Sequence, residues 1–148
     1  MLHVALYQPD IPQNVGAAIR LCACMGVTLD IIEPCGFPWD EKKIKQSGMD
    51  YLSEATIIRH DSWEAFRAAY EEWRLVLMTT KASMPYTNFE FSENDILIAG
   101  RESAGVPDSV HKDVGGRVLI PMNGKARSLN IINATAMITG EALRQVKI

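Results

Sequence analysis

The sequence predicts an α/β fold: one domain, residues 1–148, in which helices cover a mostly parallel β-sheet. Apolar, β-prone runs alternate with segments of helical periodicity along the whole chain. Most of these runs are nearly continuous in apolar residues, as is typical of strands that are covered on both faces. The 148 residues, 47% apolar and 22% charged, suit a single globular domain with its own core.

Two strands separated by a helix are expected at the start of the chain. The first strand is Leu2–Tyr7, after which Pro12 suits the first turn of a helix. Gly26 suits the position just past the end of that helix. The second strand is Val27–Ile32.

A short cationic helix, a weak strand and a further helix follow. Asp40 can cap the cationic helix, which ends near Gly48, and Thr56–Arg59 is the weak strand. The segment Asp61-Ser-Trp-Glu resembles a capping box. It opens a helix with an apolar side made of Phe66, Ala69, Tyr70 and Trp73.

The second half of the chain supplies three more strands and two helices. The strands are Arg74–Thr79, Ile96–Ala99 and Arg117–Ile120. Pro107 starts a short helix before the last strand, and Ser128 opens the helix that closes the chain.

Polar loops follow three of these strands. Ligands of parallel α/β sheets bind beyond the carboxyl ends of the strands, so these loops are candidate binding segments. They are Met78-Thr79-Thr80-Lys81, Gly100-Arg101-Glu102 and Pro121-Met122-Asn123-Gly124.

The closing helix carries no charge from Ser128 to Gly140, yet it holds Asn130 and Asn133. Its apolar residues occupy more than one face, which is typical of a deeply buried helix. Buried polar groups are costly unless they are bonded, so the two asparagines suggest a ligand or a tight partner surface.

The net charge of −3 argues mildly against a nucleic-acid-binding protein. However, no acidic residue lies between Asp113 and Glu141, a stretch that contains Arg117, Lys125 and Arg127. This distribution leaves room for a local basic patch. A second cluster, Lys42, Lys43 and Lys45, fits an ordinary solvated helix face.

Several common kinds of site and location are excluded or disfavoured. The chain has neither a G-x-G-x-x-G nor a G-x-x-x-x-G-K-[ST] fingerprint, and it has no G-x-S-x-G elbow. No targeting segment and no apolar run of about 20 residues is present, so we expect a cytoplasmic protein without a membrane partner. No metal site is expected, because the cysteines are expected to be plain reduced thiols and the histidines are scattered; these residues are Cys22, Cys24, Cys35, His3, His60 and His111.

Two charged residues allow two interpretations each. Arg20 would lie over Gly16 and Ala17 on the first helix, where it could recognise a phosphate or carboxylate or simply be exposed. Glu102 could be a base or a ligand contact, although a lone loop glutamate is more often solvated. The residues alone favour the plainer interpretation in both cases.

Taken together, several segments resemble the SPOUT class of S-adenosylmethionine-dependent RNA methyltransferases. The first motif is Leu6-Tyr-Gln-Pro-Asp-Ile-Pro-Gln-Asn-Val-Gly, continued by Ile19-Arg-Leu-Cys-Ala. Further matching segments are residues 32–40, 47–51, 79–81, 100–107 and 120–130. The match is highly specific in combination and covers nearly the whole chain. It is closest to the enzymes that methylate the ribose 2′-hydroxyl of the tRNA wobble nucleotide.

The resemblance implies a trefoil knot at the C-terminal end of the domain, a homodimer and a methyl donor held in the knot. The expected neighbours of S-adenosylmethionine are Met78, Gly100, Ile120, Ser128 and Leu129, with Gly105 shaping the loop. The positions linked to catalysis or site architecture are Asn14, Arg20, Glu102 and Asn130.

The implied reaction transfers a methyl group to the wobble ribose of a cytidine or modified uridine, in leucine tRNAs, and releases S-adenosylhomocysteine. The ribose hydroxyl must lose its proton during the attack. By the resemblance Arg20 acts here, either as a base assisted by an RNA phosphate or as an electrostatic organiser. The second role is chemically easier, because the pKa of arginine normally exceeds about 12. No metal is required.

Two departures from the family pattern bear on substrate and assembly. The middle motif, usually Gly-Pro-Glu-Thr-Arg-Gly, is Gly-Arg-Glu-Ser-Ala-Gly here, so a guanidinium moves to Arg101 and Ala104 replaces the usual arginine. The closing helix often has a tyrosine where this chain has Gly140, which predicts a different dimer packing.

Three alternatives to the wobble methyltransferase stay open from the sequence. They are a SPOUT methyltransferase for another RNA site, a SPOUT-like RNA-binding module without catalysis, and a flavodoxin-like nucleotide- or flavin-binding protein. Retention of Arg20, Ser128 and Asn130 argues against the silent module. The modest basic character predicts weak, salt-sensitive tRNA binding that depends on Arg20 and the loop from Lys125 to Arg127.

Overall fold

The computed structural model of the chain describes residues 1–48, 54–125 and 129–146. A six-stranded sheet forms its centre, with the strand order β3-β2-β1-β5-β4-β6. Every neighbouring pair of strands is parallel. The strands are β1 (His3–Tyr7), β2 (Thr28–Ile32), β3 (Ile57–His60), β4 (Arg74–Met78), β5 (Asp95–Ala99) and β6 (Gly116–Val118). The α/β fold with a parallel sheet is thereby confirmed.

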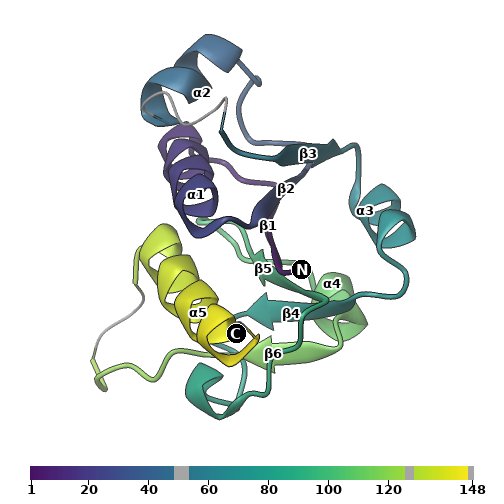
Figure 1. The fold of residues 1–148 in the computed structure, drawn as a ribbon, viewed down its shortest axis with the longest axis vertical. Coiled ribbons are helices and arrows are strands. Elements are labelled where there is room, and N and C mark those ends of the chain that lie inside the picture. The colour runs from purple at the N-terminus through teal and green to yellow at the C-terminus, as the bar shows by residue number, and fades with distance from the viewer. Residues whose placement is uncertain (49–53, 126–128, 147–148) are drawn as a thin grey trace.

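Helices cover both faces of the sheet (Figure 1). One face carries α1 (Pro12–Met25) and α5 (Ile131–Val146), and α2 (Glu41–Gly48) packs against α1. The opposite face carries α3 (Trp63–Ala69) and α4 (Asp108–Asp113). A 3-10 helix, η2 (Tyr86–Asn88), lies between β4 and β5 in the sequence.

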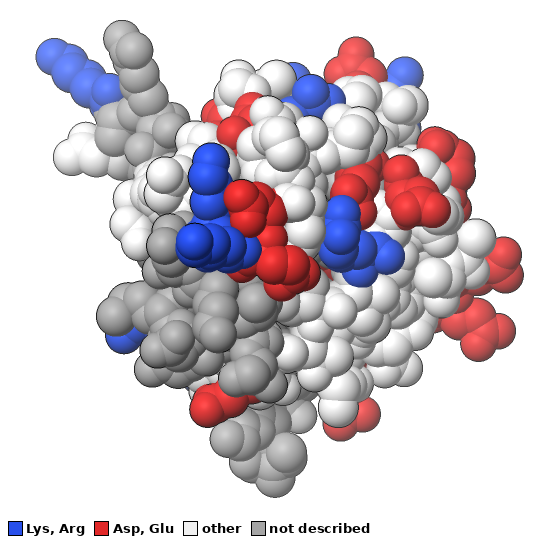
Figure 2. Space-filling model, turned by 90° about the horizontal axis from the view of Figure 1, so that it is seen from above, with Lys and Arg blue, Asp and Glu red and all other residues white. Residues whose placement is uncertain are grey.

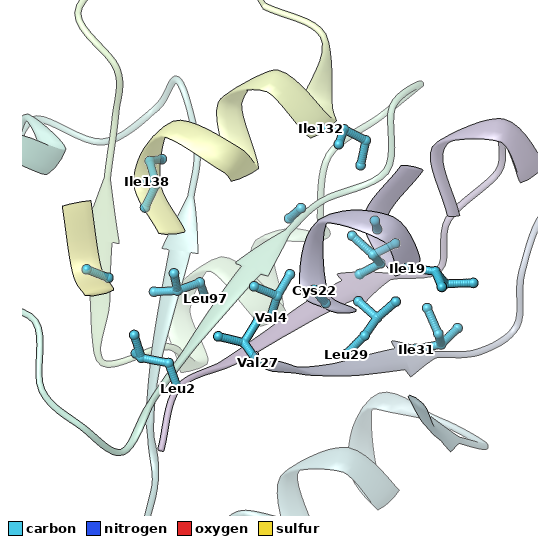
Figure 3. Packing of buried hydrophobic residues seen from close by; sticks show 14 of the residues in the cluster. Leu2, Val4, Ile19, Cys22, Val27, Leu29, Ile31, Leu97, Ile132 and Ile138 are labelled. Carbon is cyan, nitrogen blue, oxygen red and sulfur yellow. The ribbon is translucent and has the colours of Figure 1, made fainter. Parts of the chain in front are cut away.

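Two apolar cores result from this layering, because successive residues of a strand point to opposite faces. In β1, Val4 belongs to the core beneath α1 and α5, whereas Ala5 belongs to the core beneath α3 and α4. Figure 3 shows how the first core brings together side chains of the strands, of α1 and of α5. Both Ile19 and Ile138 are fully enclosed there, which fixes the two helices against the sheet.

The helix ends agree in part with the expectations. Gly26 has a φ of +70° and its N–H donates to the carbonyl of Cys22, as a C-terminal glycine should. Asp40 caps α2, since its Oδ1 accepts from the N–H groups of Lys42 and Lys43. The cap of α3 is Ser62 rather than Asp61, because its hydroxyl accepts from the Ala65 N–H at 3.0 Å.

Several expected bounds were wrong. The closing helix begins at Ile131 rather than Ser128, because Asn130 forms the cap that starts it. The expected start, Ser128, lies outside the described residues. The last strand is shorter, since β6 ends at Val118 and Leu119 continues only as a single bridge to Pro85.

Smaller shifts affect α3 and α4. α3 ends at Ala69, so Tyr70 and Trp73 of its expected apolar side lie beyond it. α4 begins one residue after Pro107. The expected trefoil knot depends on the chain path between β6 and α5. That path includes residues 126–128, which are outside the described part, so the knot stays a prediction.

Candidate functional site

Three loops that follow β4, β5 and β6 meet the N-terminal end of α5 at one edge of the sheet. An apolar pocket lies between them and reaches the carboxyl ends of all three strands. Its lining residues are Met78, Thr79, Thr80, Ala99, Val118, Leu119, Ile120, Met122, Leu129, Ile131, Ala134, Thr135 and Ile138. Two of the three loops that the sequence selected, those after β4 and β6, line this pocket.

A second pocket, richer in polar groups and here called the polar pocket, adjoins the first. It is lined by Ile11, Asn14, Met78, Thr79, Thr80, Gly100, Arg101, Glu102, Gly105, Leu129, Asn130 and Ile131. Because five residues line both pockets, the two lie side by side. The residues after β1 and β5 enter here, so the site spans the position where β1 and β5 lie side by side.

The loop after β5 is closed on itself by backbone hydrogen bonds. The N–H of Arg101 donates to the carbonyl of Gly105 at 3.0 Å, and the N–H of Gly105 donates back at 2.9 Å. Gly105 has a φ of +64°, a conformation that favours glycine. A Cβ on Gly100 would lie 2.9 Å from the backbone of Gly105, so both glycines are required for this tight turn.

Two carboxyl groups meet beside the polar pocket. Asp10 and Glu102 lie within hydrogen-bonding reach of each other, and the Ser103 hydroxyl donates to Asp10 Oδ2. Burial and the neighbouring Asp10 raise the pKa of Glu102 above its ordinary value, although a hydrogen bond with Asn14 opposes this. Hydrogen bonds with Ser103 and Glu102 lower the pKa of Asp10.

Asn130 has its side-chain oxygen committed to the helix that it caps. Its Oδ1 accepts from the N–H of Ile132 at 2.8 Å and from that of Asn133 at 3.2 Å. Asn130 also lines the polar pocket. The group that it can offer a ligand is therefore the amide NH₂, a hydrogen-bond donor.

Most of the expected site residues come together in these pockets. They are Asn14, Met78, Gly100, Glu102, Gly105, Ile120, Leu129 and Asn130. Arg20 lines neither pocket and is exposed on α1, while Ser128 lies outside the described residues. The roles expected for all ten residues stay predictions.

The structure also adds residues that the sequence did not single out. Asp10 is the carboxyl partner of Glu102, and Thr135 of α5 is a buried part of the apolar pocket. Asp10 lies just after the first strand and within the first motif of the resemblance, but no role was expected for it. Thr135 carried no signal beyond being one of the uncharged polar residues of the closing helix.

The cysteines are free thiols, as expected. Burial raises the pKa of Cys22 to about 12 and that of Cys35 to about 11, so both thiols are protonated at neutral pH. The description of the histidines as scattered was wrong for two of them. His3 and His60 both bond to Asp30 in the core, at 2.7 Å each. Among the described residues no group of three or more His, Cys, Asp or Glu side chains is arranged to hold a metal ion.

The charged groups are mixed over the face seen in Figure 2, where Lys and Arg lie among Asp and Glu. Lys125 is exposed in the loop after β6, in which Met122 lines the apolar pocket, whereas Arg127 lies outside the described residues. None of the helices in the described ranges is sufficiently long and apolar to cross a membrane.

Comparisons with known proteins agree on one family. The model of the SpoU rRNA Methylase family matches residues 1–140. A tRNA (cytidine(34)-2'-O)-methyltransferase of Beijerinckia indica subsp. indica is 57% identical over 145 residues, which cover 97% of this chain and 91% of that protein.

Solved structures give the same result. One, described as giving structural insights into the 2-OH methylation of C/U34 on tRNA, has a TM-score of 0.93 and 38% identity and covers 98% of this chain and 95% of that one. Another is the SpoU methyltransferase AviRb of Streptomyces viridochromogenes in complex with the cofactor AdoMet. Its TM-score is 0.82 at 29% identity, covering 98% of this chain and 60% of that one.

Proposed function

The chain belongs to the SpoU rRNA Methylase family, and from this membership we propose that it methylates the ribose 2′-hydroxyl of nucleotide 34 of tRNA. The methyl donor is S-adenosylmethionine and the product is S-adenosylhomocysteine. The nucleotide is a cytidine or a modified uridine, in leucine tRNAs. The observation that carries the proposal is that an apolar and a polar pocket lie side by side at the ends of β1, β4, β5 and β6.

The residues present fit the methyl donor. The apolar pocket offers hydrocarbon walls for a flat base, including Met78, Ile120 and Leu129. Gly100 and Gly105 line the adjoining polar pocket, so the tight loop after β5 forms one of its walls. When bound, S-adenosylmethionine supplies an electrophilic methyl group on a sulfonium.

The chain's own polar groups would align the acceptor ribose. Asn14, Glu102 and the Asn130 amide face the polar pocket, which adjoins the apolar one. Holding a hydroxyl in line with a methyl group converts a bimolecular step into an effectively unimolecular one. We expect much of the rate acceleration to come from this alignment.

Arg20 is proposed to act on the proton of the 2′-hydroxyl, with an RNA phosphate or as an electrostatic organiser. It is exposed on α1 and lines neither pocket of its own chain. RNA that lies along α1, or a second copy of the chain, would have to bring Arg20 and the reacting hydroxyl together.

A homodimer is part of the proposal. Met137 of α5 is 42% exposed and Leu129, just before this helix, is 38% exposed, so two large apolar side chains are open to a partner here. A Cβ on Gly140 would meet nothing within 4 Å, so this face of α5 has room for a partner. Sedimentation velocity of the protein and of Met137→Lys tests the assembly; a monomeric wild-type protein would contradict it. Since the substrate is tRNA, we place the activity in the cytoplasm.

The test is methylation of tRNA that lacks the modification. The protein is incubated with S-adenosylmethionine and a leucine tRNA transcript, and the digested RNA is searched for 2′-O-methylated nucleosides by mass spectrometry. A matched tRNA with a 2′-deoxy nucleotide at position 34 should accept no methyl group. Transfer to both tRNAs would show that a position other than 34 is methylated. Donor binding without transfer to any tRNA would favour another RNA as the substrate. Absence of donor binding would favour a silent RNA-binding module.

A further inference from the structure

Asp10 and Glu102 are brought together by the sheet. Asp10 follows β1 and Glu102 follows β5, and these strands are paired in parallel up to Leu6 and Ala99. Their carboxyl ends therefore deliver the two acids to the same edge. Two carboxylates in contact repel each other, so both cannot be ionised without a large cost.

The remaining contacts leave one oxygen of each acid without a donor. Asp10 Oδ2 accepts from the Ser103 hydroxyl, and Glu102 is hydrogen-bonded to Asn14. Asp10 Oδ1 and Glu102 Oε2 are buried and have no donor among the described residues. A buried acceptor without a donor costs about 1–3 kcal/mol. A single proton between the two acids would satisfy both oxygens at once.

The surroundings fit a pair that carries one negative charge. Arg101 is the cation whose field reaches Asp10, and Cys35 faces Glu102 from the loop after β2 as a neutral thiol. On the same side Gly36 packs against Asp10, where a Cβ would lie 2.6 Å from the Asp10 Cβ. Asn14 and Ser103 add only neutral polar groups. One shared proton and the Arg101 guanidinium therefore offset the negative charge of the two carboxyl groups.

We propose that Asp10 and Glu102 share one proton, and that Asp10 is thereby a positioning residue that holds Glu102 in place at the polar pocket. The shared proton ties the loop after β1 to the loop after β5. The expected effect of the shared proton on catalysis rests on the proposed function. The shared proton neutralises one of the two negative charges that would otherwise face the approaching RNA. It also keeps Glu102 oriented toward Asn14.

The direction of the pKa of Glu102 agrees with this geometry, since burial and Asp10 raise it above 4.5. The folded protein then binds the proton more tightly than the unfolded chain. The stabilisation from the shared proton is complete below pH 4.5 and is lost as the pH rises through the raised pKa.

Carbon-13 NMR of the side-chain carboxyl groups tests the sharing directly, on the full chain and without RNA. In the wild type, the signal assigned through Glu102→Gln should titrate above the ordinary value. In Asp10→Asn the amide removes a negative charge and donates to Glu102, so the titration should move down by about one pH unit or more. Ser103→Ala is the matched control, because it removes a bond to Asp10 but leaves the shared proton and should move the Glu102 midpoint far less.

Three results would overturn the proposal. These are a Glu102 signal that titrates at or below its ordinary value, a midpoint that Asp10→Asn does not move, and a wild-type titration that Mg²⁺ and chelator shift in opposite directions. The last result would indicate two carboxylates bridged by a cation. If Asp10→Asn does not fold, Asp10→Ala decides, because loss of the Asp10 carboxylate must also move the Glu102 midpoint down.

The pH profile of methyl transfer tests the positioning role. Wild-type activity should decline on the alkaline side as the shared proton is lost, and Asp10→Asn, which supplies a permanent donor, should flatten that decline. A profile that Asp10→Asn leaves unchanged contradicts the positioning role. Loss of methyl transfer in every protein, with the NMR shift intact, would refute the proposed function and leave the shared proton standing.

Discussion

Two groups of carboxyl side chains on the same sheet differ in burial and in the number of hydrogen-bond donors that they receive. Asp30 of β2 is fully buried and accepts hydrogen bonds from His3 Nδ1, His60 Nε2 and the Tyr70 hydroxyl, each at 2.7 Å. The Asp10–Glu102 pair, at the strand ends, leaves two buried oxygens without a donor. Asp30 lies within β2, whereas Asp10 and Glu102 follow the ends of the neighbouring parallel strands β1 and β5.

The difference agrees with a stabilising role for the Asp30 cluster and with the role in the site that we propose for the Asp10–Glu102 pair. The Asp30 cluster joins β1, β3 and the end of α3, and its rings pack edge to face, with the centroids of His3 and Tyr70 5.3 Å apart. Satisfied buried networks rigidify a core. Unsatisfied polar groups beside a pocket are costly for stability, so their presence calls for a role in binding or catalysis.

The largest expected effect comes from breaking the satisfied cluster. Asp30→Ala leaves two buried histidines and the half-buried Tyr70 without their common partner, so we expect a loss of about 3–5 kcal/mol in the free energy of unfolding. Urea denaturation measures it. The folded variant should keep its affinity for the methyl donor, because Asp30 lines neither pocket. A loss below about 1 kcal/mol would mean that the cluster adds little to stability.

The second effect belongs to the site. Gly100→Ala would place a Cβ 2.9 Å from the Gly105 backbone and force the loop after β5 to shift. We expect a loss of about 1–3 kcal/mol in stability, as for other overpacked sites. We also expect a donor affinity reduced at least about tenfold, which corresponds to about 1.4 kcal/mol. Calorimetric titration with S-adenosylmethionine measures the affinity. Gly124→Ala is the control, since nothing lies within 4 Å of its Cβ.

A smaller effect tests whether the donors of Asp30 act together. Tyr70→Phe removes one donor of the three, and we expect a loss of about 1–2 kcal/mol in the free energy of unfolding with unchanged methyl transfer. Burial and Asp30 raise the pKa of Tyr70, so the phenol remains a protonated donor at neutral pH. In a double-mutant cycle with His60→Ala, additivity would show independent bonds, whereas a coupling above about 0.5 kcal/mol would show a network.

The sequence predicted the layered fold well because each strand and helix carries a local signal. Strand periodicity placed β1, β2, β4 and β5 to within a residue or two, and Gly26 marked the end of α1. The ends of β6 and α5 were harder to predict. There the chain is ordered by a bridge to Pro85 and by a side-chain cap, which the apolar pattern does not contain.

The parallel sheet alone predicted which strand-end loops line the pockets, whereas the individual site residues were predictable only through the resemblance and their contacts were not predictable at all. Local patterns favoured a solvated Glu102 because the sequence does not reveal that Asp10, 92 positions earlier, meets it across two paired strands. In the same way His3 and His60 are distant in sequence and meet only because β1 and β3 flank β2. Contacts between strands depend on the strand order, which no periodicity encodes.

The smallest expected effect separates the two roles of Asn130, a cap and a donor to the polar pocket. Asn130→Ala loses both, so it should cost about 1 kcal/mol of stability, typical of a lost cap, and also slow methyl transfer. Asn130→Asp keeps the capping oxygens and adds a negative charge at the N-terminal end of α5, where it is favourable. It should therefore retain full stability while losing the amide donor. If methyl transfer slows equally in both variants, the amide NH₂ serves the reaction; if Asn130→Asp is fully active, Asn130 belongs with Asp30 as a purely structural residue.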